Sequence, residues 1–591
     1  MKPLPASRWS YSLFKDFYTI FTLMFSGATW SYALLAAVFI ISAGNEFINY
    51  RSGNIIGKFY GALLDHDEKA FWKTFYKASI LYIGQTLMIA TFTFLSWILS
   101  YFLRKNLVKK LHEMYFSRKA YFHLCHDNIK FIDNPDQRIS QDAEKLTTIF
   151  GQSIVPYVIV APAVIAFYTY KTWKTAGGIS VACIYGYFVI GFIANRIMAI
   201  PITRWTRRQE KAEGNFRFKH MSVRDNAEES AFYDAGEFEK TESNKILDVL
   251  ILTLERYAWW KYPAQWFQLF FDYYGGVLTY LIQFIPVFIM NSYSDYTPGK
   301  LTTQISNNAF VFIYLINSFT RLTDLAMNIG EMAAYTIRIG EFVSFCRAVT
   351  DEDNTVAKLN EKEPILYKLD NVNIYAQGAP KTEVSNLTVQ FEARKNILLT
   401  GSSGSGKTSL LRILKGLWKP QSGTIHSAIS SKEVMFLPQN CYLPTGGLSL
   451  MDQLLFPLHT KTMENIPDIN TITEILVSLQ LEKLISLCGN ITDEVDFEWK
   501  DVLSPGEQQR LSLARALIHR PAVVIMDEGT SSVSEDMEKR MYSMLKKNGI
   551  NYISTGHRGT LLEYHDLELS LDNRSVWKLS EIRKGKYSEQ F

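Results

Sequence analysis

The sequence predicts an α-helical polytopic membrane domain followed by an α/β domain with a phosphate-binding loop. Hydrophobic residues make up 47% of the 591 residues, and they concentrate before about residue 330. There they form runs of roughly 20 residues, the length that a helix needs to cross a bilayer. Short apolar strands and helical segments follow, and one such strand leads into the glycine-rich stretch GSSGSGKTS.

Six apolar segments predict six membrane spans. A buried helix of a soluble protein could mimic one such segment, but not six in series. The segments lie near residues 28–48, 79–102, 153–170, 179–199, 266–290 and 309–327. We therefore expect a transmembrane domain with long cytosolic loops over residues 1–345, a charged linker over 346–363 and a soluble domain over 364–591.

Basic residues between the spans predict the orientation. They are dense between the second and third spans and between the fourth and fifth, and sparse between the fifth and sixth. Because basic residues accumulate on the cytosolic side, both long loops and the soluble domain should face the cytosol. Both loops are predicted to be helices that continue tens of ångströms beyond the membrane. The net charge of +4 gives no indication of nucleic-acid binding.

Charged residues of the loops and polar residues of the spans have two interpretations each. At the tips of the loops, Asp136, Arg138, Glu228 and Glu229 are either solvated charges or coupling contacts that transmit motion between domains. Within the spans, polar residues are costly and usually line a pathway or pair with each other. On this basis Arg321 and Asp324 are expected to pair, and the candidate pathway residues are Asp272 and Asn317.

The stretch GSSGSGKTS matches the phosphate-loop pattern G-x-x-x-x-G-K-[ST]. It follows the apolar strand NILLT and precedes a helical segment, an order that a glycine-serine linker does not explain. Lys407 would meet the β- and γ-phosphates of ATP, and Thr408 would ligate Mg²⁺. Backbone N–H groups would surround the phosphates along the whole stretch: Gly401, Ser402, Ser403, Gly404, Ser405, Gly406, Lys407, Thr408 and Ser409.

Three further strand ends carry residues suited to ATP hydrolysis. The apolar strand AVVIM ends at Asp527, the expected Mg²⁺ ligand, and Glu528, which is placed to polarise the attacking water. Gln439 is expected to contact Mg²⁺ and the same water, and His557 the γ-phosphate. A glutamine or histidine at a strand end is usually structural. Their order and spacing in this chain favour a catalytic role.

The order of these elements around LSPGEQQR resembles the nucleotide-binding domain of ATP-binding cassette (ABC) transporters. By this resemblance, LSPGEQQR is the signature motif, with Pro505 where glycine is commonest, and Tyr375 stacks on adenine. Ser534 occupies the place of the aspartate that usually ends the dimer-contact loop. The signature residues expected to contact ATP are Ser504, Gly506 and Glu507.

The signature opens a helix, and a helix N-terminus attracts phosphate. In a dimer this end would face the γ-phosphate held by the phosphate loop of the other chain. Each chain would then supply half of two composite sites, which explains why the motif occurs once. We therefore expect a homodimer.

Two stretches of the long loops resemble elements of subfamily D of these transporters: IDNPDQRISQD and NAEESAFYDAGE. Four stretches more narrowly resemble the cobalamin-transporting, lysosomal branch of that subfamily: GNFRFKHMSVRDNAEESAFY, NNAFVFIYLINSFTRLTDL, GKTSLLRILKGLW and the LSPGE form of the signature. The resemblance implies an exporter-type ABC fold of six spans, embedded in membrane lipid, with ATP and Mg²⁺ as cofactors. It further implies transport of cobalamin from the lysosomal lumen to the cytosol, and an escort membrane protein that delivers the transporter.

Other functions remain open from the sequence. Relatives of this subfamily carry fatty acids or acyl-CoA in peroxisomes, and bacterial ones import peptides or hydrophilic solutes. The peroxisomal and endoplasmic reticulum membranes are accordingly alternative locations to the lysosomal one. A non-transporting adaptor is the alternative from another class, and the intact set of catalytic residues argues against it.

Overall fold

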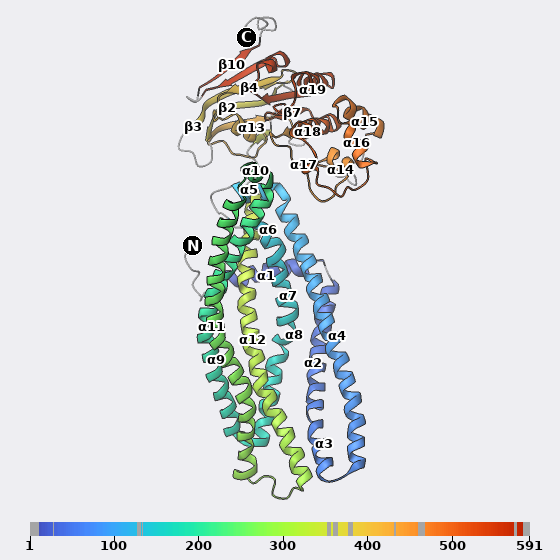
Figure 1. The fold of residues 1–591 in the computed structure, drawn as a ribbon, viewed down its shortest axis with the longest axis vertical. Helices are drawn as coiled ribbons and strands as arrows, with labels where there is room; N and C mark the ends of the chain where they lie inside the picture. Colours follow the sequence, from blue (N-terminus) through green and yellow to red (C-terminus); the bar gives the residue numbers. More distant parts are fainter. Residues whose placement is uncertain are drawn as a thin grey trace. The chain divides into compact units, whose positions relative to one another are not determined.

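The computed structural model divides the chain into two compact units, Met1–Asp351 and Glu352–Phe591. It describes residues 11–582 except 28, 127–131, 133, 352–355, 359–364, 376–381, 431–432, 459–466 and 573–575. The first unit is helical and the second contains both sheets (Figure 1). The last helix of the first unit ends at Asp351, so it extends into the segment that was predicted as a linker.

Long helices build the first unit. Within the described residues, four helical runs are long and apolar enough to cross a membrane: Thr29–Leu64, Glu68–Tyr115, Pro135–Asp225 and Pro298–Val349. The third run reverses direction at Gly177, where φ is 76° and ψ is 179°, and therefore supplies two passes (Figure 1). Helix α11 (Gly236–Phe284) covers most of the predicted fifth span. In the sequence it lies between these two passes and the last helix of the unit.

The described part of this unit contains α-helices and short 3₁₀- and π-helical segments. Their bounds are α1 Tyr11–Phe25, α2 Thr29–Gly53, α3 Ile55–Leu64, α4 Glu68–Tyr115, η1 Ser117–Lys119, α5 Ala120–His126, α6 Pro135–Gln137, η2 Arg138–Asp142, α7 Ala143–Thr148, η3 Ile149–Ile154, α8 Val155–Val158, α9 Val160–Asp225, α10 Ala227–Phe232, α11 Gly236–Phe284, η4 Ile285–Ile289 and α12 Pro298–Asp351.

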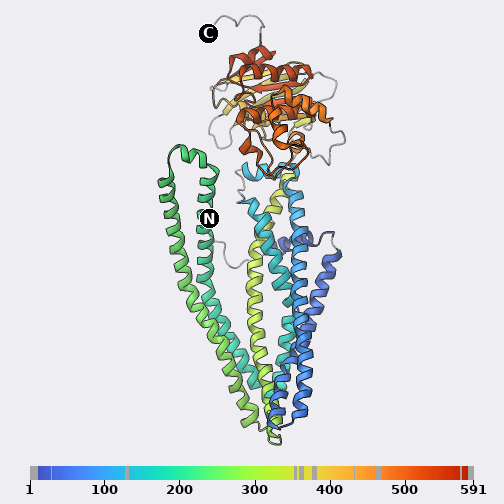
Figure 2. The same cartoon turned by 45° about the vertical axis from the view of Figure 1, so that its right-hand side comes forward.

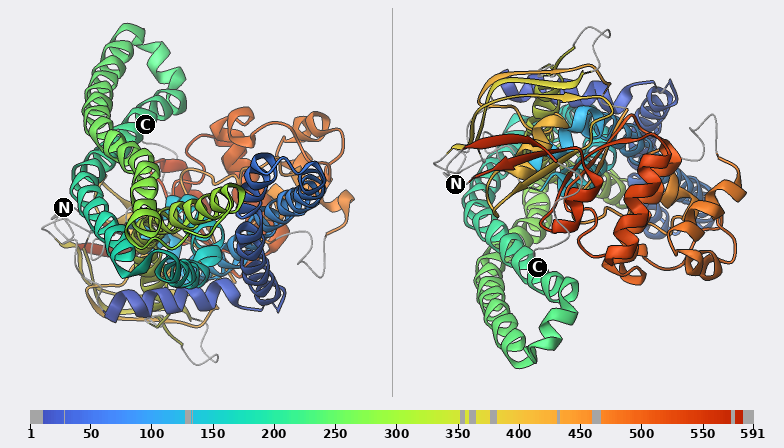
Figure 3. Two further views of the ribbon diagram at one scale, coloured as in Figure 1. Left: turned by 90° about the horizontal axis from the view of Figure 1, so that it is seen from below. Right: turned by 90° about the horizontal axis from the view of Figure 1, so that it is seen from above.

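Several helices are longer than a bilayer is thick. The 48 residues of α4 span about 72 Å at 1.5 Å per residue, more than twice the hydrocarbon core of about 30 Å. Helices α9 and α11 form an antiparallel pair that diverges from the rest of the unit toward α10 (Figure 2). In the view along the long axis, this pair and the pair α2 and α4 lie on opposite sides of the unit (Figure 3).

Helix α1, which was not predicted, packs against α4 and α12. Its buried side chains Ile20, Met24 and Phe25 share one apolar cluster with residues of both helices. Asn106 of α4 donates a hydrogen bond of 3.0 Å to the backbone oxygen of Met24. Because residues of α4 and α12 also belong to this cluster, α1 is packed against the helical unit, although it precedes the first predicted span in the sequence.

Arg321 of α12 pairs with Glu46 of α2, a contact across two spans. Its Nη1 lies 3.2 Å from Glu46 Oε1, and its guanidinium lies over the ring of Tyr314. The Tyr314 hydroxyl donates to the other oxygen of Glu46 and accepts a bond of 3.1 Å from Asn49. The sequence had predicted a local pair of Arg321 with Asp324, and the structure adds Glu46 of α2 as a partner of Arg321.

The second unit contains two sheets. The first has the strand order β1-β5-β2-β3, and the second the order β10-β9-β4-β8-β7-β6. In the second sheet all pairs are parallel except β10 with β9. The strand bounds are β1 Val356–Lys358, β2 Ile365–Tyr375, β3 Thr382–Glu392, β4 Ile397–Gly401, β5 Ser422–Ser427, β6 Val434–Leu437, β7 Val523–Met526, β8 Asn551–Thr555, β9 Leu567–Leu571 and β10 Trp577–Glu581.

Buried strands explain the apolar runs of this unit. Along β7, Val523 and Ile525 join one apolar cluster, while Val524 and Met526 join the other on the opposite face of the sheet. Helices cover both clusters. Their bounds are α13 Lys407–Leu414, α14 Leu450–Leu455, α15 Ile469–Ser478, α16 Glu482–Cys488, α17 Trp499–Val502, α18 Pro505–His519, α19 Glu535–Lys547 and η5 Gly559–Tyr564.

Candidate functional site

The phosphate loop joins β4 to α13 at the carboxyl end of the parallel strands. Gly401, Gly404 and Gly406 have φ of 141°, 80° and 91°, in the region that favours glycine. A Cβ at Gly401 would lie 2.2 Å from the backbone oxygen of Leu571, so no larger residue fits there. The sequence therefore forms a tight cradle in which backbone N–H groups can converge on an anion.

Lys407 lies inside this cradle and is buried. Its Nζ donates to the backbone oxygens of Gly401 at 2.7 Å and Ser402 at 2.9 Å. Burial lowers the pKa of Lys407, and the charges of Glu528 and Asp527 oppose that shift. The buried hydroxyl of Ser405 has no hydrogen-bond partner within the described part of the chain. A free donor and a cation at one cradle fit a bound phosphate group.

Two oxygen ligands for a divalent cation lie next to the loop. Thr408 Oγ1 is 3.3 Å from Asp527 Oδ1, and Thr555 Oγ1 donates to the same carboxylate oxygen at 2.9 Å. Mg²⁺ is bound through one or two protein oxygens together with phosphate oxygens and waters. Thr408 and Asp527 could therefore hold Mg²⁺, which stays a prediction, and Thr555 orients the carboxylate.

Glu528 is held by both other predicted catalytic residues. Gln439 donates 2.9 Å to Glu528 Oε2, and His557 Nε2 lies 3.4 Å from Oε1. The backbone N–H of Glu528 donates to Thr555 Oγ1 at 2.9 Å. Its φ of 50° lies in the left-handed region, which a non-glycine residue adopts only when its surroundings enforce it. Gln439, Glu528 and His557 thus meet at one point, from three segments far apart in the sequence.

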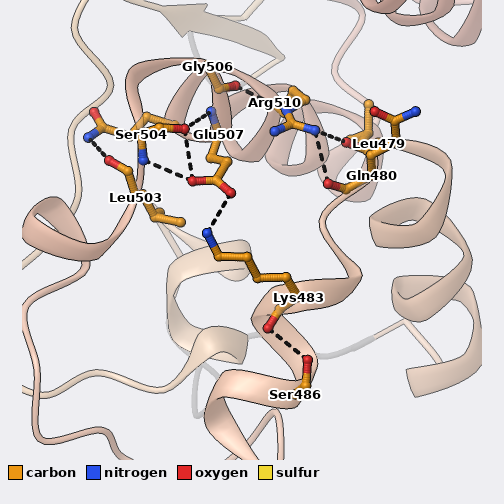
Figure 4. A network of polar contacts seen from close by, with 10 residues as sticks. Leu479, Gln480, Lys483, Ser486, Leu503, Ser504, Gly506, Glu507 and Arg510 are labelled. Carbon is orange, nitrogen blue, oxygen red and sulfur yellow. Dashed lines mark hydrogen bonds and ion pairs between the residues drawn. The ribbon is translucent and has the colours of Figure 1, made fainter.

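The signature motif forms the N-terminus of α18. Ser504 is the N-cap, and Glu507 completes a reciprocal capping box with it (Figure 4). A Cβ at Gly506 would lie 2.8 Å from the backbone oxygen of Ser532, so this position packs against the loop that follows Glu528. Gln509 of α18 also contacts that loop, since its side chain bonds to Ser531 Oγ at 3.0 Å and to the N–H of Ser532 at 2.9 Å.

The sequence did not reveal the contacts that hold this loop. Arg558, next to His557, donates to the backbone oxygens of Val533 and Ser531, both at 2.9 Å. Its guanidinium also pairs at 3.5 Å with Glu538 of α19, whose side chain is 1% exposed. In the sequence, the only indication of a role for Arg558 was its position directly after the predicted histidine, His557. Gln509 was detectable as a polar residue on the apolar face of α18.

Ser534, which occupies the place of the usual aspartate, is the N-cap of α19. Its hydroxyl accepts from the N–H of Met537 at 3.4 Å. Serine and aspartate are both favoured N-caps, so the substitution keeps the local structure of the loop while removing a charge.

One predicted coupling residue is placed differently from the expectation. Arg138 is buried, 7% exposed, and its Nη1 donates 2.5 Å to the backbone oxygen of Arg338 and lies 3.1 Å from Glu341 on α12. The expectation of an exposed charge at a loop tip is therefore wrong for Arg138, because η2 packs on α12. Asp136 starts the same segment on α6, and Glu228 and Glu229 lie exposed on α10.

The remaining predicted residues lie away from these contacts or outside the description. Asn317 is exposed on α12 of the single chain. The side chains of Tyr375, at the end of β2, and Asp272, within α11, lie outside the described residues. Their predicted roles in stacking on adenine and in the substrate pathway stay predictions.

Comparisons with known proteins agree with this architecture. The family described as "ABC transporter transmembrane region 2" matches residues 20–288, and the family "ABC transporter" matches residues 384–531. The mouse (Mus musculus) protein named lysosomal cobalamin transporter ABCD4 is 34% identical over 568 residues, which cover 91% of each chain. ABC transporter D family member 3 of Dictyostelium discoideum is 26% identical, covering 98% of this chain and 90% of that protein.

A solved structure has the same fold. The structure of a bacterial Atm1-family ABC exporter with ATP bound aligns with a TM-score of 0.68, covering 93% of this chain and 94% of that one. At 18% sequence identity, this likeness concerns the fold alone. It confirms the predicted exporter-type arrangement of a helical domain followed by a nucleotide-binding domain.

Proposed function

The chain belongs to subfamily D of the ABC transporters, and on that premise we propose that it moves cobalamin from the lysosomal lumen to the cytosol. It is an ATP-driven half-transporter, with one helical domain and one ATP-hydrolysing domain, and a functional unit therefore needs two chains. The observation that supports cobalamin is the 34% identity to a lysosomal cobalamin transporter over 91% of both chains. We take the unit to be a homodimer in the lysosomal membrane.

The residues of the site have distinct roles in the proposed cycle. The cradle around Lys407 would bind the phosphates of ATP, and Thr408 with Asp527 would hold Mg²⁺. The ion, when bound, neutralises charge on the β- and γ-phosphates. Glu528 accepts a proton from the attacking water, and Gln439 and His557 orient its carboxylate.

In the homodimer, each signature helix completes the ATP site of the other chain. The N-terminus of α18 would present the positive end of its helix dipole and the backbone N–H of Gly506 to the γ-phosphate. A Ser504→Arg substitution places a long side chain at this N-cap. We expect ATP binding within about twofold of the original protein and ATP hydrolysis reduced roughly a hundredfold, because dimer closure is blocked. Strong residual hydrolysis would argue against the composite site.

Transport from loaded vesicles tests the substrate and its direction. The purified full-length protein is inserted in liposomes that contain cobalamin, and Mg²⁺ with ATP is added outside. Only molecules with outward-facing nucleotide-binding domains are energised, so release of cobalamin measures movement toward the cytosolic side. The matched control is Glu528→Gln, which keeps the size of the side chain and removes the carboxylate.

Stimulation of ATP hydrolysis separates the candidate substrates. Cobalamin should stimulate hydrolysis by the protein in liposomes, and a long-chain acyl-CoA should not. Stimulation by acyl-CoA and not by cobalamin would contradict the proposed substrate and favour a fatty acid or acyl-CoA instead. Transport at full rate by the Glu528→Gln variant would instead contradict the ATP-driven mechanism.

A further inference from the structure

The fifth residue of the signature motif is an acid, and its carboxylate is fixed at the start of α18. Glu507 Oε2 accepts from the N–H of Ser504 at 2.9 Å and from Ser504 Oγ at 2.8 Å (Figure 4). The N–H of Glu507 in turn donates to Ser504 Oγ at 3.4 Å. The carboxylate therefore occupies the end of the helix that the proposed composite site offers to a phosphate.

This placement creates an electrostatic conflict. A carboxylate is stabilised at a helix N-terminus by the partial positive charge there, and so is a phosphate group. Burial raises the pKa of Glu507, but the bonds from Ser504 and Lys483 outweigh it and hold the pKa below its ordinary value. Glu507 is thus ionised at neutral pH, and an unneutralised charge here would repel the γ-phosphate of the partner's ATP.

Lys483 supplies the compensating charge from another helix. Its Nζ lies 3.0 Å from Glu507 Oε1, the oxygen that the capping box leaves free (Figure 4). The side chain of Glu507 is 13% exposed and that of Lys483 is 63% exposed. An ion pair this exposed contributes little to the stability of the fold, so a role in stability explains little of its presence.

Arg510 fixes the segment that carries Lys483. From the second turn of α18, its Nη1 donates to the backbone oxygens of Leu479 at 3.0 Å and Gln480 at 2.9 Å, just before α16 begins. Its Nε donates to the backbone oxygen of Gly506 at 3.3 Å. Because Arg510 ties the start of α16 to the signature helix, Lys483 stays beside Glu507 as this part of the domain moves.

We propose that Lys483 is a positioning residue of the ATPase reaction, which neutralises Glu507 so that the N-terminus of α18 can accept the γ-phosphate of ATP on the second copy of this chain. The proposal rests on the composite site proposed above. It assigns Lys483 an effect on the apparent affinity for ATP during hydrolysis, with little effect on folding.

The test is steady-state ATP hydrolysis by the full-length protein in lipid nanodiscs. Lys483→Met removes the charge and keeps most of the side-chain length. We expect the KM for ATP to rise roughly fivefold or more, because repulsion of a multiply charged phosphate is only partly screened at this site. The rise should shrink at high ionic strength. The control is Lys546→Met, at an exposed lysine on α19.

A second substitution at the same position distinguishes neutralisation from a structural role. Lys483→Arg keeps the positive charge and changes the shape of the side chain. Its KM for ATP should stay within about twofold of the original value, whereas the KM of Lys483→Met rises. An unchanged KM in Lys483→Met, or a KM in Lys483→Arg as high as in Lys483→Met, overturns the proposal.

Failure of the composite site would be visible separately. Unimpaired hydrolysis by the Ser504→Arg variant would show that α18 does not face the partner's ATP. If Ser504→Arg is inactive and Lys483→Met keeps its KM, the composite site stands and only the role of Lys483 is wrong. Thermal unfolding of each variant reports whether the protein is folded.

Discussion

Gln439 donates a hydrogen bond of 2.9 Å to the carboxylate of Glu528, across a separation of 89 residues in the sequence. The two side chains come from the segment after β6 and the end of β7, which are neighbouring parallel strands. Because these strands end at the same edge of the sheet, the proposed general base and a residue that orients it are brought together. The fold itself therefore places Gln439 against the carboxylate of Glu528.

Replacing Gln439 should slow hydrolysis more than binding. In Gln439→Ala, Glu528 loses one of its two side-chain partners, and we expect kcat to fall about tenfold, with ATP binding within about twofold. Glu528→Gln should reduce kcat by a hundredfold or more, in the range for loss of a general base. The measurement is hydrolysis and binding of ATP by full-length protein, with the neighbouring exposed Asn440→Ala as control. Equal kcat values in Gln439→Ala and Asn440→Ala would show that Gln439 has no role in hydrolysis.

The buried carboxylate of Glu538 should make the domain sensitive to loss of Arg558. Glu538 accepts from Thr530 Oγ1 at 2.9 Å and Thr560 Oγ1 at 2.8 Å, and Arg558 is its cation. Arg558→Met leaves a buried charge without its counter-ion and should lower the free energy of unfolding by roughly 2 kcal/mol.

A double variant separates charge from packing at this pair. Arg558→Met/Glu538→Gln should be less destabilised than Arg558→Met alone, because the uncompensated charge is gone. Chemical unfolding of full-length protein measures the difference, and Arg540→Met on the exposed side of α19 is the matched control. If Arg558→Met and Arg540→Met lower the free energy of unfolding equally, the ion pair between Arg558 and Glu538 does not stabilise the domain.

The pair between Glu46 and Arg321 should behave as a unit within the membrane. Glu46 is 13% exposed at its side chain and Arg321 is 45% exposed, and a single charge in a span is costly. Either Glu46→Gln or Arg321→Met alone should reduce stability in lipid by roughly 1–2 kcal/mol, after allowance for the exposure of Arg321.

Removing both charges at once tests this interpretation. The double variant Glu46→Gln/Arg321→Met should be at least as stable as the less stable of the two single variants. Thermal unfolding in nanodiscs measures these stabilities. The control is Lys300→Met, at an exposed lysine near the start of α12. Additive losses in the double variant would show that the two charges do not interact.

Acidification should destabilise the nucleotide-binding domain through His565. Burial lowers the pKa of His565 to about 4, against an opposing hydrogen bond to Leu561 and the charge of Asp566. The folded state therefore holds the imidazole neutral, whereas the unfolded state binds a proton below about pH 6.5. The stabilising contribution is complete above that pH and is lost as the pH falls from about 6.5 toward 4. At about pH 5.5 the loss is roughly 1 kcal/mol.

Hydrogen exchange of β8 measures this dependence in the full-length protein. Ser554 of β8 bonds to His565, so its neighbours should report the local stability after correction for intrinsic exchange rates. His565→Gln should flatten the dependence, because glutamine does not titrate. A residual slope of the same sign should remain in this variant, because partial burial also lowers the pKa of the half-buried His519. The control is His426→Gln. If the dependence of local stability on pH is as steep in His565→Gln as in His426→Gln and the original protein, His565 is not its cause.

The sequence by itself determined the parts of this protein that contiguous residues specify. Apolar runs required helices in a membrane, because an unsatisfied backbone is too costly there. Gly401–Ser409 required a phosphate cradle, since its glycines and Lys407 lie within one loop. The candidate catalytic residues were detectable because each follows a buried strand, and parallel strands that end at one edge bring such residues together.

Only the tertiary structure decided the pairs between distant segments. Arg321 meets Glu46 across 275 residues, Arg138 meets Glu341 across 203, and Lys483 meets Glu507 across 24. A charged side chain has the same local sequence signal whether it is solvated or buried against a partner. Its partner is set by the packing of whole helices, whose energy comes from many apolar contacts elsewhere. For this reason Arg138 was expected at an exposed tip, and the compensation of Glu507 could not be recognised before α16 was placed beside α18.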